Sequence, residues 1–340
     1  MKKIRSTVVV LLSLIFFLAE VTVVDFAEAN FIPPLPELPT PICIREDGTV
    51  EGGSDALQRT GNIYTFVKDI NEIIEIQKDN VMIDGNGFTL TKPELNSTIP
   101  IVPVGWCPSI RISNRDNVII KNITFNTCFT GVSIKNSSNV IIIQNIISNG
   151  KVGIYMTSST NCSIVGNKIV DHSGSGLKID DSSHLKIEYN VISKNHSHGG
   201  WIAVSYSNIS RNEISYNTAS NVGIGLYLYG SNSYNFFFEN NFINNDIGLV
   251  YQGPSVDNVV LNNYWNNYQE ELGNVAKDGN DSDKSPLSNP ISISFESSLF
   301  PLPSLHTVAE FSSLTLMVAG FFATAILSIT YRRRLKGRTK

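Results

Sequence analysis

Charged residues are scarce in this sequence, and acidic residues outnumber basic ones. The 340 residues include 26 Lys and Arg and 30 Asp and Glu, together 16% of the chain. Three residues of each sign lie within the first 29 residues and six basic residues lie within the last nine, which leaves 17 basic and 27 acidic residues between these ends. A net charge of about −10 offers no complementarity to a phosphate backbone. The composition therefore excludes nucleic acid as a partner.

Helical periodicity and sulfur are also rare. No segment between the apolar stretches has a 3.6-residue apolar period, which excludes an α/β fold with crossover helices. The apolar stretches are only a few residues long, too short for the long strands of a β-sandwich. Within the repeats described below, methionine occurs only at Met82 and Met156. Thioether ligands for copper(I) are therefore scarce.

The first 29 residues have the layout of a secretory signal peptide. Three basic residues precede an apolar run from Thr7 to Leu18, and Ala27-Glu28-Ala29 supplies small residues for cleavage. This order is typical of a signal peptide that is removed after Ala29. The alternative is an uncleaved membrane anchor, because the apolar character continues to Phe26.

The other end has the features of a membrane anchor. Residues Phe311 to Tyr331 contain no charge and are long enough to cross a bilayer as a helix. The basic tail that follows, residues 332–340, is expected on the cytoplasmic side. We therefore expect an exported protein of the cell surface, anchored in the cytoplasmic membrane by this helix, with the bulk of the chain outside the cell.

A repeat of about 22 residues occupies the middle of the chain. Its first signature is a pair of apolar residues five positions apart with Asn between them, as in Ile142-x-x-Asn145-x-Ile147. This step begins at residues 83, 120, 142, 164, 187, 209, 237 and 260. The second signature, eleven to thirteen residues later, is Gly followed by two apolar residues separated by one residue, as in Gly153-Ile154-x-Met156.

This period predicts an all-β fold, a parallel β-helix in which each repeat forms one coil. Equivalent residues of successive coils then lie roughly 4.8 Å apart. The apolar columns are expected to line a continuous core, and the glycines to relieve a bend. Asn residues are expected to stack as an amide ladder at a bend with left-handed backbone, at Asn145, Asn167, Asn190 and Asn212.

The repeat also divides the chain into regions. Residues 30–61 are expected to form an N-terminal linker, 62–79 an N-terminal cap and 80–268 the β-helix. Residues 269–310 would form a C-terminal cap and a proline-containing stalk before the anchor. Caps are required because the end coils would otherwise expose the core.

Several segments resemble one group of repeat proteins. They are "DNVMIDGNGFTL", "NVIIKNITF", the Gly-apolar-x-apolar strands, and "NNYWNNY" followed by "DGNDSD", between residues 62 and 290. These segments resemble the right-handed parallel β-helix proteins of the NosD-like type, within the carbohydrate-binding and sugar-hydrolysis repeats common in exported archaeal proteins. The resemblance implies a right-handed coil and three alternative functions, which are polysaccharide binding, polysaccharide cleavage and a role in copper delivery. The matching residues are structural, so the resemblance does not choose among these functions.

A polysaccharide-cleaving enzyme would need acidic and basic side chains along one groove. The catalytic candidates are Asp171, His172 and His198, with Asp180 and His196 as further members of such a groove. Binding without catalysis is favoured, because the carboxylates of a glycosidase must face one another across the substrate. Asp180 and Asp181 are instead sequence neighbours after a strand, and we expect this pair to be a solvated turn.

Histidines on neighbouring coils suggest a metal site as an alternative. Counting back four residues from Gly176 and Gly200 places His172 and His196 at one level on adjacent coils. Imidazoles at this spacing could share a divalent ion. The other interpretation is that these are loop histidines without an ion, since metal sites also need fixed supporting partners. The candidate ligands are His172, His196, His198 and Asp171.

The segment Asp278 to Asp283 places oxygen ligands at alternate positions, as calcium loops do. It lacks the turn glycine and the distal Glu of an EF-hand. We therefore interpret it as an acidic, solvated linker.

Aromatic residues gather in the later coils. Exposed aromatic faces can stack against sugar rings, whereas rings that fill or cap the core would serve only the fold. The sequence leaves both interpretations open. The candidate ligand-binding residues are Trp201, Tyr227, Tyr229 and Tyr251, with Tyr206 and Tyr234 in the same set.

The four cysteines are expected to be structural. Cys107 and Cys128 precede equivalent strand positions on adjacent coils, so they are predicted to form a disulfide. Cys162 shares an inward column with Val118, Val140 and Leu185 and is expected to be a buried thiol, while the partner of Cys43 stays unassigned. Export makes N-glycosylation an expectation as well. The sequons lie at Asn96, Asn122, Asn136, Asn161, Asn195, Asn208 and Asn280.

The favoured function is a membrane-anchored surface protein that binds extracellular carbohydrate or another surface component. The alternatives are a polysaccharide hydrolase or lyase, and a metal-binding accessory protein. The expected partners are the membrane and a polysaccharide or surface glycan. No cofactor is assigned, apart from the divalent ion of the last alternative.

Overall fold

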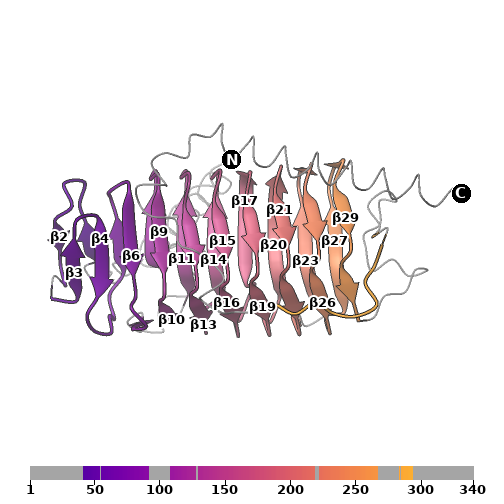
Figure 1. Ribbon diagram of the computed structural model, residues 1–340, viewed down its shortest axis with the longest axis horizontal. Coiled ribbons are helices and arrows are strands. Elements are labelled where there is room, and N and C mark those ends of the chain that lie inside the picture. The colour runs from indigo at the N-terminus through magenta and orange to yellow at the C-terminus, as the bar shows by residue number, and fades with distance from the viewer. Residues whose placement is uncertain are drawn as a thin grey trace, which may run out of the picture. The chain divides into compact units, whose positions relative to one another are not determined.

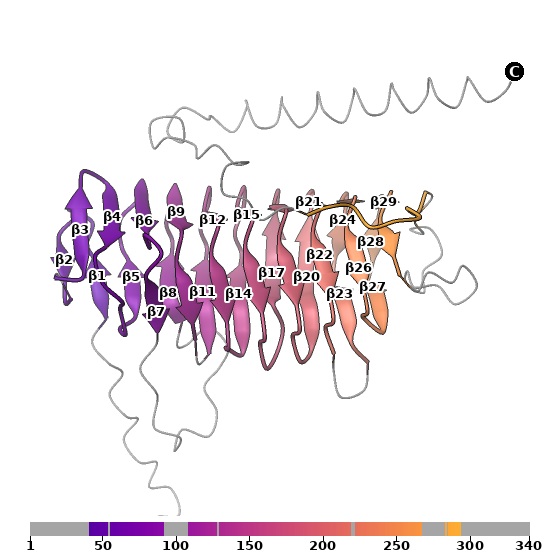
Figure 2. The same ribbon diagram turned by 60° about the horizontal axis from the view of Figure 1, so that its bottom comes forward.

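The computed structural model describes residues 41–53, 55–91, 108–127, 129–218, 222–266, 283 and 285–293. Over these residues the chain is all β, and its strands stack as a parallel β-solenoid of about eight turns (Figures 1 and 2). The predicted signal peptide, transmembrane helix and basic tail lie outside the described residues. In the part of the chain that is described, no helix has the length and apolar character needed to cross a membrane.

Three sheets form the walls of the solenoid, and each coil contributes one strand to each sheet. Sheet A consists of β1 (Ile42–Ile44), β2 (Val50–Glu51), β5 (Ile74–Ile76), β8 (Pro108–Ser113), β11 (Thr130–Lys135), β14 (Val152–Thr157), β17 (Leu177–Ser183), β20 (His198–Ser205), β23 (Ile224–Tyr229), β24 (Asn232–Ser233), β27 (Ile247–Gln252) and β28 (Ser255–Val256). Sheet B consists of β3 (Leu57–Thr60), β4 (Ile63–Phe66), β6 (Val81–Asp84), β9 (Val118–Lys121), β12 (Ile141–Ile143), β15 (Ser163–Val165), β18 (Lys186–Glu188), β21 (Asn208–Ser210), β25 (Phe236–Phe238) and β29 (Val259–Leu261). Sheet C consists of β7 (Thr89–Thr91), β10 (Thr124–Asn126), β13 (Ile146–Ser148), β16 (Lys168–Val170), β19 (Val191–Ser193), β22 (Glu213–Ser215), β26 (Asn241–Ile243) and β30 (Tyr264–Trp265).

The register of the strands confirms the repeat. The first apolar residue of the five-residue step lies in sheet B, where Ile142 pairs with Ile164. The second lies in sheet C, where Ile147 pairs with Ile169. The Gly-apolar-x-apolar signature forms sheet A. One coil departs from the predicted step, because Leu90 rather than Phe88 pairs with Phe125.

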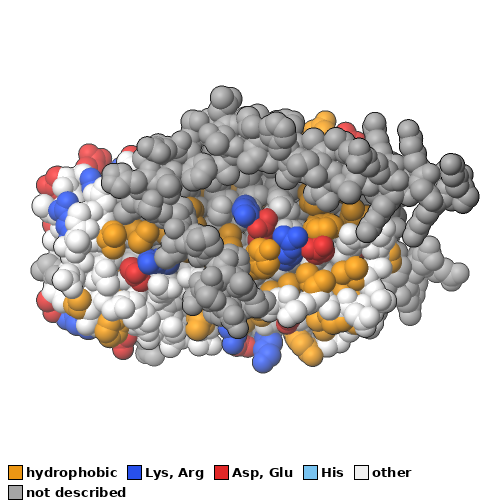
Figure 3. All heavy atoms as spheres, in the orientation of Figure 1, with side chains coloured by type: hydrophobic (Ala, Val, Ile, Leu, Met, Phe, Trp, Pro, Cys, Tyr) orange, Lys and Arg blue, Asp and Glu red, His pale blue; other side chains and the backbone are white. Residues whose placement is uncertain are grey.

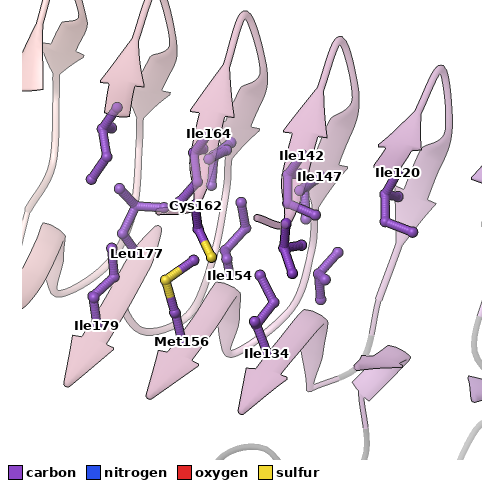
Figure 4. Packing of buried hydrophobic residues seen from close by; sticks show 14 of the residues in the cluster. Ile120, Ile134, Ile142, Ile147, Ile154, Met156, Cys162, Ile164, Leu177 and Ile179 are labelled. Atoms are coloured by element: carbon purple, nitrogen blue, oxygen red, sulfur yellow. The ribbon is translucent and has the colours of Figure 1, made fainter. Parts of the chain in front are cut away.

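The apolar columns meet inside the solenoid and form one continuous core (Figure 4). Ile142, Ile154 and Leu177 are completely buried there. Each such side chain stabilises the fold by roughly 1.5–3 kcal/mol relative to its exposed state. Cys162 is 1% exposed and carries its sulfur into this core beside Met156, which confirms the predicted buried thiol.

The predicted amide ladder is present between sheets B and C, but its conformational basis differs from the prediction. Asn190 Oδ1 accepts hydrogen bonds from the backbone N–H and the side-chain Nδ2 of Asn167, at 2.9 and 3.0 Å. The ladder Asn does not adopt the left-handed conformation. The preceding residue does, with φ of 57° at Gln144 and 57° at Tyr189. The Asn is selected for its amide rather than for its backbone.

The repeated glycine of sheet A is explained by close approach between coils. A Cβ atom on Gly153 would lie 2.5 Å from Ile169 Cγ2 and 2.6 Å from the carbonyl oxygen of Gly176. Such distances leave no space for a side chain, so glycine allows the next coil to stack at the normal strand spacing.

The N-terminal boundary lies earlier than the sequence predicted. β1 already pairs in parallel with β5, so the described part of the predicted linker 30–61 belongs to the sheets. β3 and β4 form an antiparallel hairpin, and β4 continues sheet B by pairing with β6. The predicted cap, residues 62–79, therefore forms the N-terminal end of the solenoid together with the strands that precede it.

Asp283 closes the ladder at the other end. It is 4% exposed and accepts the backbone N–H groups of Asn262 and Asn263 as well as Nε1 of Trp265, at 3.1, 2.8 and 3.0 Å. These bonds use the carboxylate that the sequence had placed in a solvated acidic linker, so that interpretation is wrong for Asp283. Residues 278–282 lie outside the described residues.

Candidate functional site

His172 belongs to the interior of the solenoid and not to a surface site. It is completely buried, its Nδ1 accepts the N–H of Gly150 at 3.1 Å, and its Nε2 lies 3.1 Å from the carbonyl oxygen of Ile147. An acceptor at Nδ1 requires the proton on Nε2, which leaves neither nitrogen for a metal or a substrate. Burial lowers the pKa of His172 to about 4. Its prediction as a catalytic or metal-binding residue is wrong.

The two consecutive glycines of β20 caused this error in register. Leu177 pairs with Gly200, so Gly176 corresponds to Gly199 rather than to Gly200. The residue beside His172 on the next coil is therefore Asn195, whose Oδ1 accepts the N–H of His172 at 3.2 Å.

The remaining members of the predicted metal site are not assembled with His172. Asp171 and His196 are exposed on the bend that connects sheets C and A. His198 lies at the start of β20. Among the described residues, no group of three His, Cys, Asp or Glu side chains is close enough to hold a metal ion. The described residues therefore do not form the predicted metal site.

The outer face of sheet A brings functional side chains into register instead. Along β14, side chains alternate between the core and this face, with Ile154 and Met156 inside and Tyr155 outside. Tyr155 pairs with Lys178, which pairs with Trp201, which pairs with Tyr227. Figure 2 shows the strands that carry them, β14, β17, β20 and β23, side by side. These four side chains form a column along the solenoid.

Four rings at one end of this column pack together, and we call them the platform: His198, Trp201, Tyr227 and Tyr229. The ring centroid of Trp201 lies 4.9 Å from that of Tyr227, 5.5 Å from that of Tyr229 and 5.3 Å from that of His198. His198 also stacks on Tyr227 at 5.4 Å. All four side chains are half-buried, so they lie on the wall without being part of the core.

His198 is held in its neutral form within the platform. Burial lowers its pKa from the ordinary value, with the backbone of Ser197 acting in the opposite direction. Its Nδ1 is buried and has no hydrogen-bond partner. An unpaired buried nitrogen costs free energy.

The other predicted aromatic ligands serve different purposes. Tyr251 is 5% exposed and packs edge-on against Phe237 in the core, so its prediction as a ligand-binding residue is wrong. Tyr206 and Tyr234 are exposed, but their rings stack at 4.9 Å with an interplanar angle of 11°. His184 extends the same stack at 5.3 Å from Tyr206. Rings this close cover each other's faces and leave mainly their edges free.

Asp180 lies on the platform's face of sheet A, where the sequence predicted only a solvated turn. A β-bulge between β17 and β20 places Asp180 and Asp181 opposite the single residue between Ile202 and Val204. Burial raises the pKa of the Asp180 carboxyl, and its Oδ1 is buried without a hydrogen-bond partner. Burial likewise raises the pKa of Tyr155, as does the nearby charge of Asp180. Bulges are common beside active sites.

A signal for this bulge is present in the sequence. Ser159 and Ser182 occupy equivalent positions on adjacent coils, 23 residues apart. Between the next two coils the spacing is 23 residues at Ile179 and Ile202, but 22 residues at Ser182 and Val204. The change of spacing within one strand falls on Asp180-Asp181. A register count on each side of the pair could have located the bulge.

The described sequons differ in accessibility. Asn195 is completely buried, and its Nδ2 donates to Asn217 Oδ1 at 2.8 Å, so the prediction of glycosylation is wrong for this residue in the folded chain. Asn136 is exposed, whereas Asn122, Asn161 and Asn208 are half-buried and stay predictions. Asn96, Asn280 and the predicted disulfide pair Cys107 and Cys128 lie outside the described residues, and Cys43 is a buried free thiol.

Some of the charged side chains elsewhere on the surface form ion pairs. Ion pairs join Lys121 to Asp84 at 2.8 Å, Lys186 to Glu188 at 3.1 Å and Arg211 to Glu239 at 2.8 Å. Figure 3 shows one face on which acidic and basic side chains lie next to each other between uncharged ones. Pairing of this kind leaves no large area of one sign on that face.

Solved structures similar to this chain are β-helix proteins of low sequence identity. The periplasmic alginate epimerase AlgG is 13% identical, with 62% of this chain and 74% of that chain covered and a TM-score of 0.43. PfbA, a surface adhesin of Streptococcus pneumoniae, is 15% identical over 58% and 57% of the two chains, with a TM-score of 0.38. DFA-IIIase from Arthrobacter chlorophenolicus A6 is 13% identical over 63% and 56%, with a TM-score of 0.38.

No curated protein matches the sequence of this chain. One family model does match, over residues 59–281, which is more than half of the chain and nearly all of the solenoid. Its description is "Periplasmic copper-binding protein (NosD)". The chain therefore belongs to the NosD family of β-helix proteins.

Proposed function

We propose that this protein is exported and binds extracellular carbohydrate through the platform on the outer face of sheet A. The observation that carries the proposal is the packing of His198, Trp201, Tyr227 and Tyr229 on a wall where no core requires them. Apolar ring faces combined with polar ring edges are the surface that a sugar ring complements, because a sugar has apolar C–H patches bordered by hydroxyl groups.

The position of the platform supports this proposal. Trp201 and Tyr227 occupy one outward column in register, and Tyr229 adds a ring two residues further along β23. Mutual packing restricts the four rings, so little side-chain entropy is lost when a ligand binds.

The test is binding of the full-length protein to a glycan array, followed by titration of the best ligand. Replacing a central aromatic residue of a binding site costs about 2 kcal/mol or more, so Trp201→Ala should weaken binding by roughly 30-fold. Tyr234→Ala is the matched control, because it removes an exposed ring outside the platform. Equal affinity of Trp201→Ala and the unmodified protein for every bound glycan would refute the proposal.

Polysaccharide cleavage is a second candidate function, favoured by Asp180. This carboxyl lies in the bulge beside the platform with a raised pKa, as a group that donates or accepts a proton in a reaction would. Reducing-sugar and unsaturated-product release on the bound glycans would measure it. Turnover that Asp180→Asn abolishes, without loss of binding, would make the protein an enzyme; absence of turnover would leave binding as its function.

Copper binding, the activity in the family's description, does not fit the described donor residues. Met156 and Cys162 are core residues, Cys43 is 8% exposed, and His172 uses both ring nitrogens in hydrogen bonds. Of the remaining described histidines, His184 lies in the exposed ring stack, His196 is exposed on the bend and His198 lies in the platform, and none belongs to a group of three metal-binding side chains. To hold copper, sulfur and imidazole donors would have to lie together around one ion, and the described ones do not.

A further inference from the structure

Lys178 occupies a position on the outer face of sheet A that distinguishes it from the paired cations of sheet B. It lies in register between Tyr155 on β14 and Trp201 on β20, and its Nζ is 5.9 Å from the ring centroid of Tyr155. Among the described residues, no carboxylate lies within ion-pair distance of this Nζ, whereas Lys186 on sheet B pairs with Glu188. The ammonium group of Lys178 therefore lies in the middle of an aromatic column, where it can pair with an anionic group of a ligand.

The nearest carboxyl group does not fully neutralise Lys178. Asp180 follows two residues later on β17 and faces the same side of sheet A, yet it forms no ion pair with Lys178. Lys178 acts on Asp180 only through longer-range attraction, and Asp181 opposes that attraction. Lys178 therefore supplies a positive charge beside the platform, in a sequence whose net charge is −4.

Further cations follow the same face toward the N-terminal coils. Arg111 lies in the column of Lys178, since Arg111 pairs with Ser133 and Ser133 with Tyr155. Lys135 on β11 is exposed in the next outward column. Arg111 also lines a depression of about 290 Å³ on this face, where it meets Glu75 at 3.4 Å. Three coil steps, roughly 14 Å, separate Arg111 from Lys178.

We propose that the platform recognises an acidic sugar, whose anionic group pairs with Lys178 while its ring packs against Trp201, in a polymer that extends along sheet A toward Arg111. This inference rests on the proposed carbohydrate-binding function and adds the chemical class of the ligand. A carboxylate and a sulfate share the charge that Lys178 would recognise, and neutral sugars lack it. An acidic polymer would also be repelled by the rest of this acidic protein, so the cations of sheet A define where it can bind.

The experiment compares three polymers on the full-length protein by titration calorimetry or affinity electrophoresis. Polygalacturonate supplies carboxylates, its fully methyl-esterified form supplies the same backbone without charge, and dextran sulfate supplies sulfates. Lys178→Gln should weaken binding of the acidic polymer by about tenfold or more, because a charge-assisted hydrogen bond contributes roughly 1.5–3 kcal/mol. Lys178→Arg should restore much of the affinity, and Lys186→Gln is the control on another wall.

Oligomer length tests the direction of the polymer. Arg111→Gln should leave short oligogalacturonates unaffected and weaken long ones, since only a long chain reaches from Trp201 to Arg111. An equal effect on all lengths would contradict the proposed path along sheet A.

The outcomes separate this inference from the proposed function. Equal binding of the charged and esterified polymers, unchanged by Lys178→Gln but lost in Trp201→Ala, would overturn the acidic class and retain carbohydrate binding. Binding that is unaffected by Trp201→Ala would overturn both proposals, as would failure of all three polymers and the glycan array. Preference for dextran sulfate over polygalacturonate, sensitive to Lys178→Gln, would assign the anion as a sulfate.

Discussion

The bend that connects sheets C and A and the outer face of sheet A carry the same kinds of residue with opposite consequences. His172 on the bend turns inward, makes hydrogen bonds with both nitrogens and continues an amide ladder. His198, at the start of β20, faces outward with an unpaired Nδ1 among aromatic rings. Burial lowers the pKa of both histidines. What differs is the surroundings of each ring: His172 uses both nitrogens inside the ladder, whereas the half-buried ring of His198 packs among the platform rings on the outer wall.

The largest effect is expected from breaking the interior ladder. Asn190→Ala would leave the backbone N–H of Asn167 without its acceptor, while Asn167 Nδ2 keeps the carbonyl oxygens of Ile142 and Val165. The variant also loses the two hydrogen bonds that Asn190 Nδ2 donates to backbone carbonyls. An unsatisfied buried donor costs about 1–3 kcal/mol and each lost hydrogen bond about 0.5–1.5 kcal/mol, so we expect the free energy of unfolding to fall by roughly 3 kcal/mol or more. Urea denaturation followed by circular dichroism measures it. Lys178→Gln on the outer face should change the free energy of unfolding by less than about 0.5 kcal/mol. Comparable losses in both variants would contradict the view that the ladder stabilises the fold and the outer face does not.

The pH dependence of stability is the next largest effect. The pKa of His172 is about 4 in the folded protein and near 6.5 in the unfolded chain, so below pH 6.5 the unfolded state binds more protons. The stability associated with neutral His172 is complete above pH 6.5 and is lost as the pH falls toward 4, by about 3 kcal/mol. Thermal and urea unfolding between pH 7 and 4 measures this loss.

A matched variant isolates the contribution of His172. Asn occupies the equivalent ladder positions at Asn195 and Asn217, so His172→Asn should fold and should show a smaller loss of stability between pH 6.5 and 4. Glycan binding should be unchanged in this variant. An unchanged pH profile would show that His172 does not cause the loss of stability at low pH. Loss of glycan binding in this variant would show that His172 belongs to the functional site.

A smaller effect is expected on the outer face itself. Asp180 lies two residues from Lys178 on the same face, and its negative charge, when ionised, opposes an acidic ligand there. Asp180→Asn removes that charge and should strengthen binding of polygalacturonate severalfold. Titration calorimetry of the two proteins at one pH measures the change, and equal affinities would contradict this role of Asp180.

The core thiol should contribute less to stability than the ladder or His172 does. Cys162 is 1% exposed and its pKa is raised to about 12 by burial, so it should resist alkylation until the protein unfolds. Cys162→Val keeps an apolar side chain of similar size and should cost less than about 1.5 kcal/mol. Peptide mapping after iodoacetamide treatment measures the labelling. A cysteine introduced by Lys135→Cys on the exposed wall should be labelled rapidly, and equal labelling at both positions would contradict the assigned orientation.

The fold could be predicted from the sequence because the same pattern of residues recurs in successive coils of a solenoid. The five-residue step of Ile142 and Ile147 recurs in every coil, so chance matches are averaged out and the register of the core columns is determined. The amide ladder was predicted on the same basis. Its left-handed bend was assigned to the Asn instead of the residue before it, because many residue types occupy that bend and no sequence pattern marks it.

The site could be predicted only in part, because it depends on single-residue shifts. Trp201, Tyr227 and Tyr229 were identified as candidates from their chemistry. Whether each ring faced the core or solvent was left open, and Tyr251 turned out to be a core residue. The Gly199-Gly200 pair moved His172 beside Asn195, and β17 continues through Asp180, whose carboxyl therefore lies on the outer face beside Lys178. A strand has a period of two residues, so one inserted residue reverses the direction of each side chain after it.

The carboxylate of Asp283 also has a consequence for how such a chain can be lengthened. Each ladder Asn donates toward the next coil and accepts from the previous one, so a coil can be duplicated anywhere in the column without changing its chemistry. A carboxylate accepts but cannot donate, and Asp283 therefore ends the series that an Asn would continue. Gene duplication or protein design could add coils before Asp283 and keep the closure intact, whereas Asp283→Asn would turn a terminus into a site for further growth.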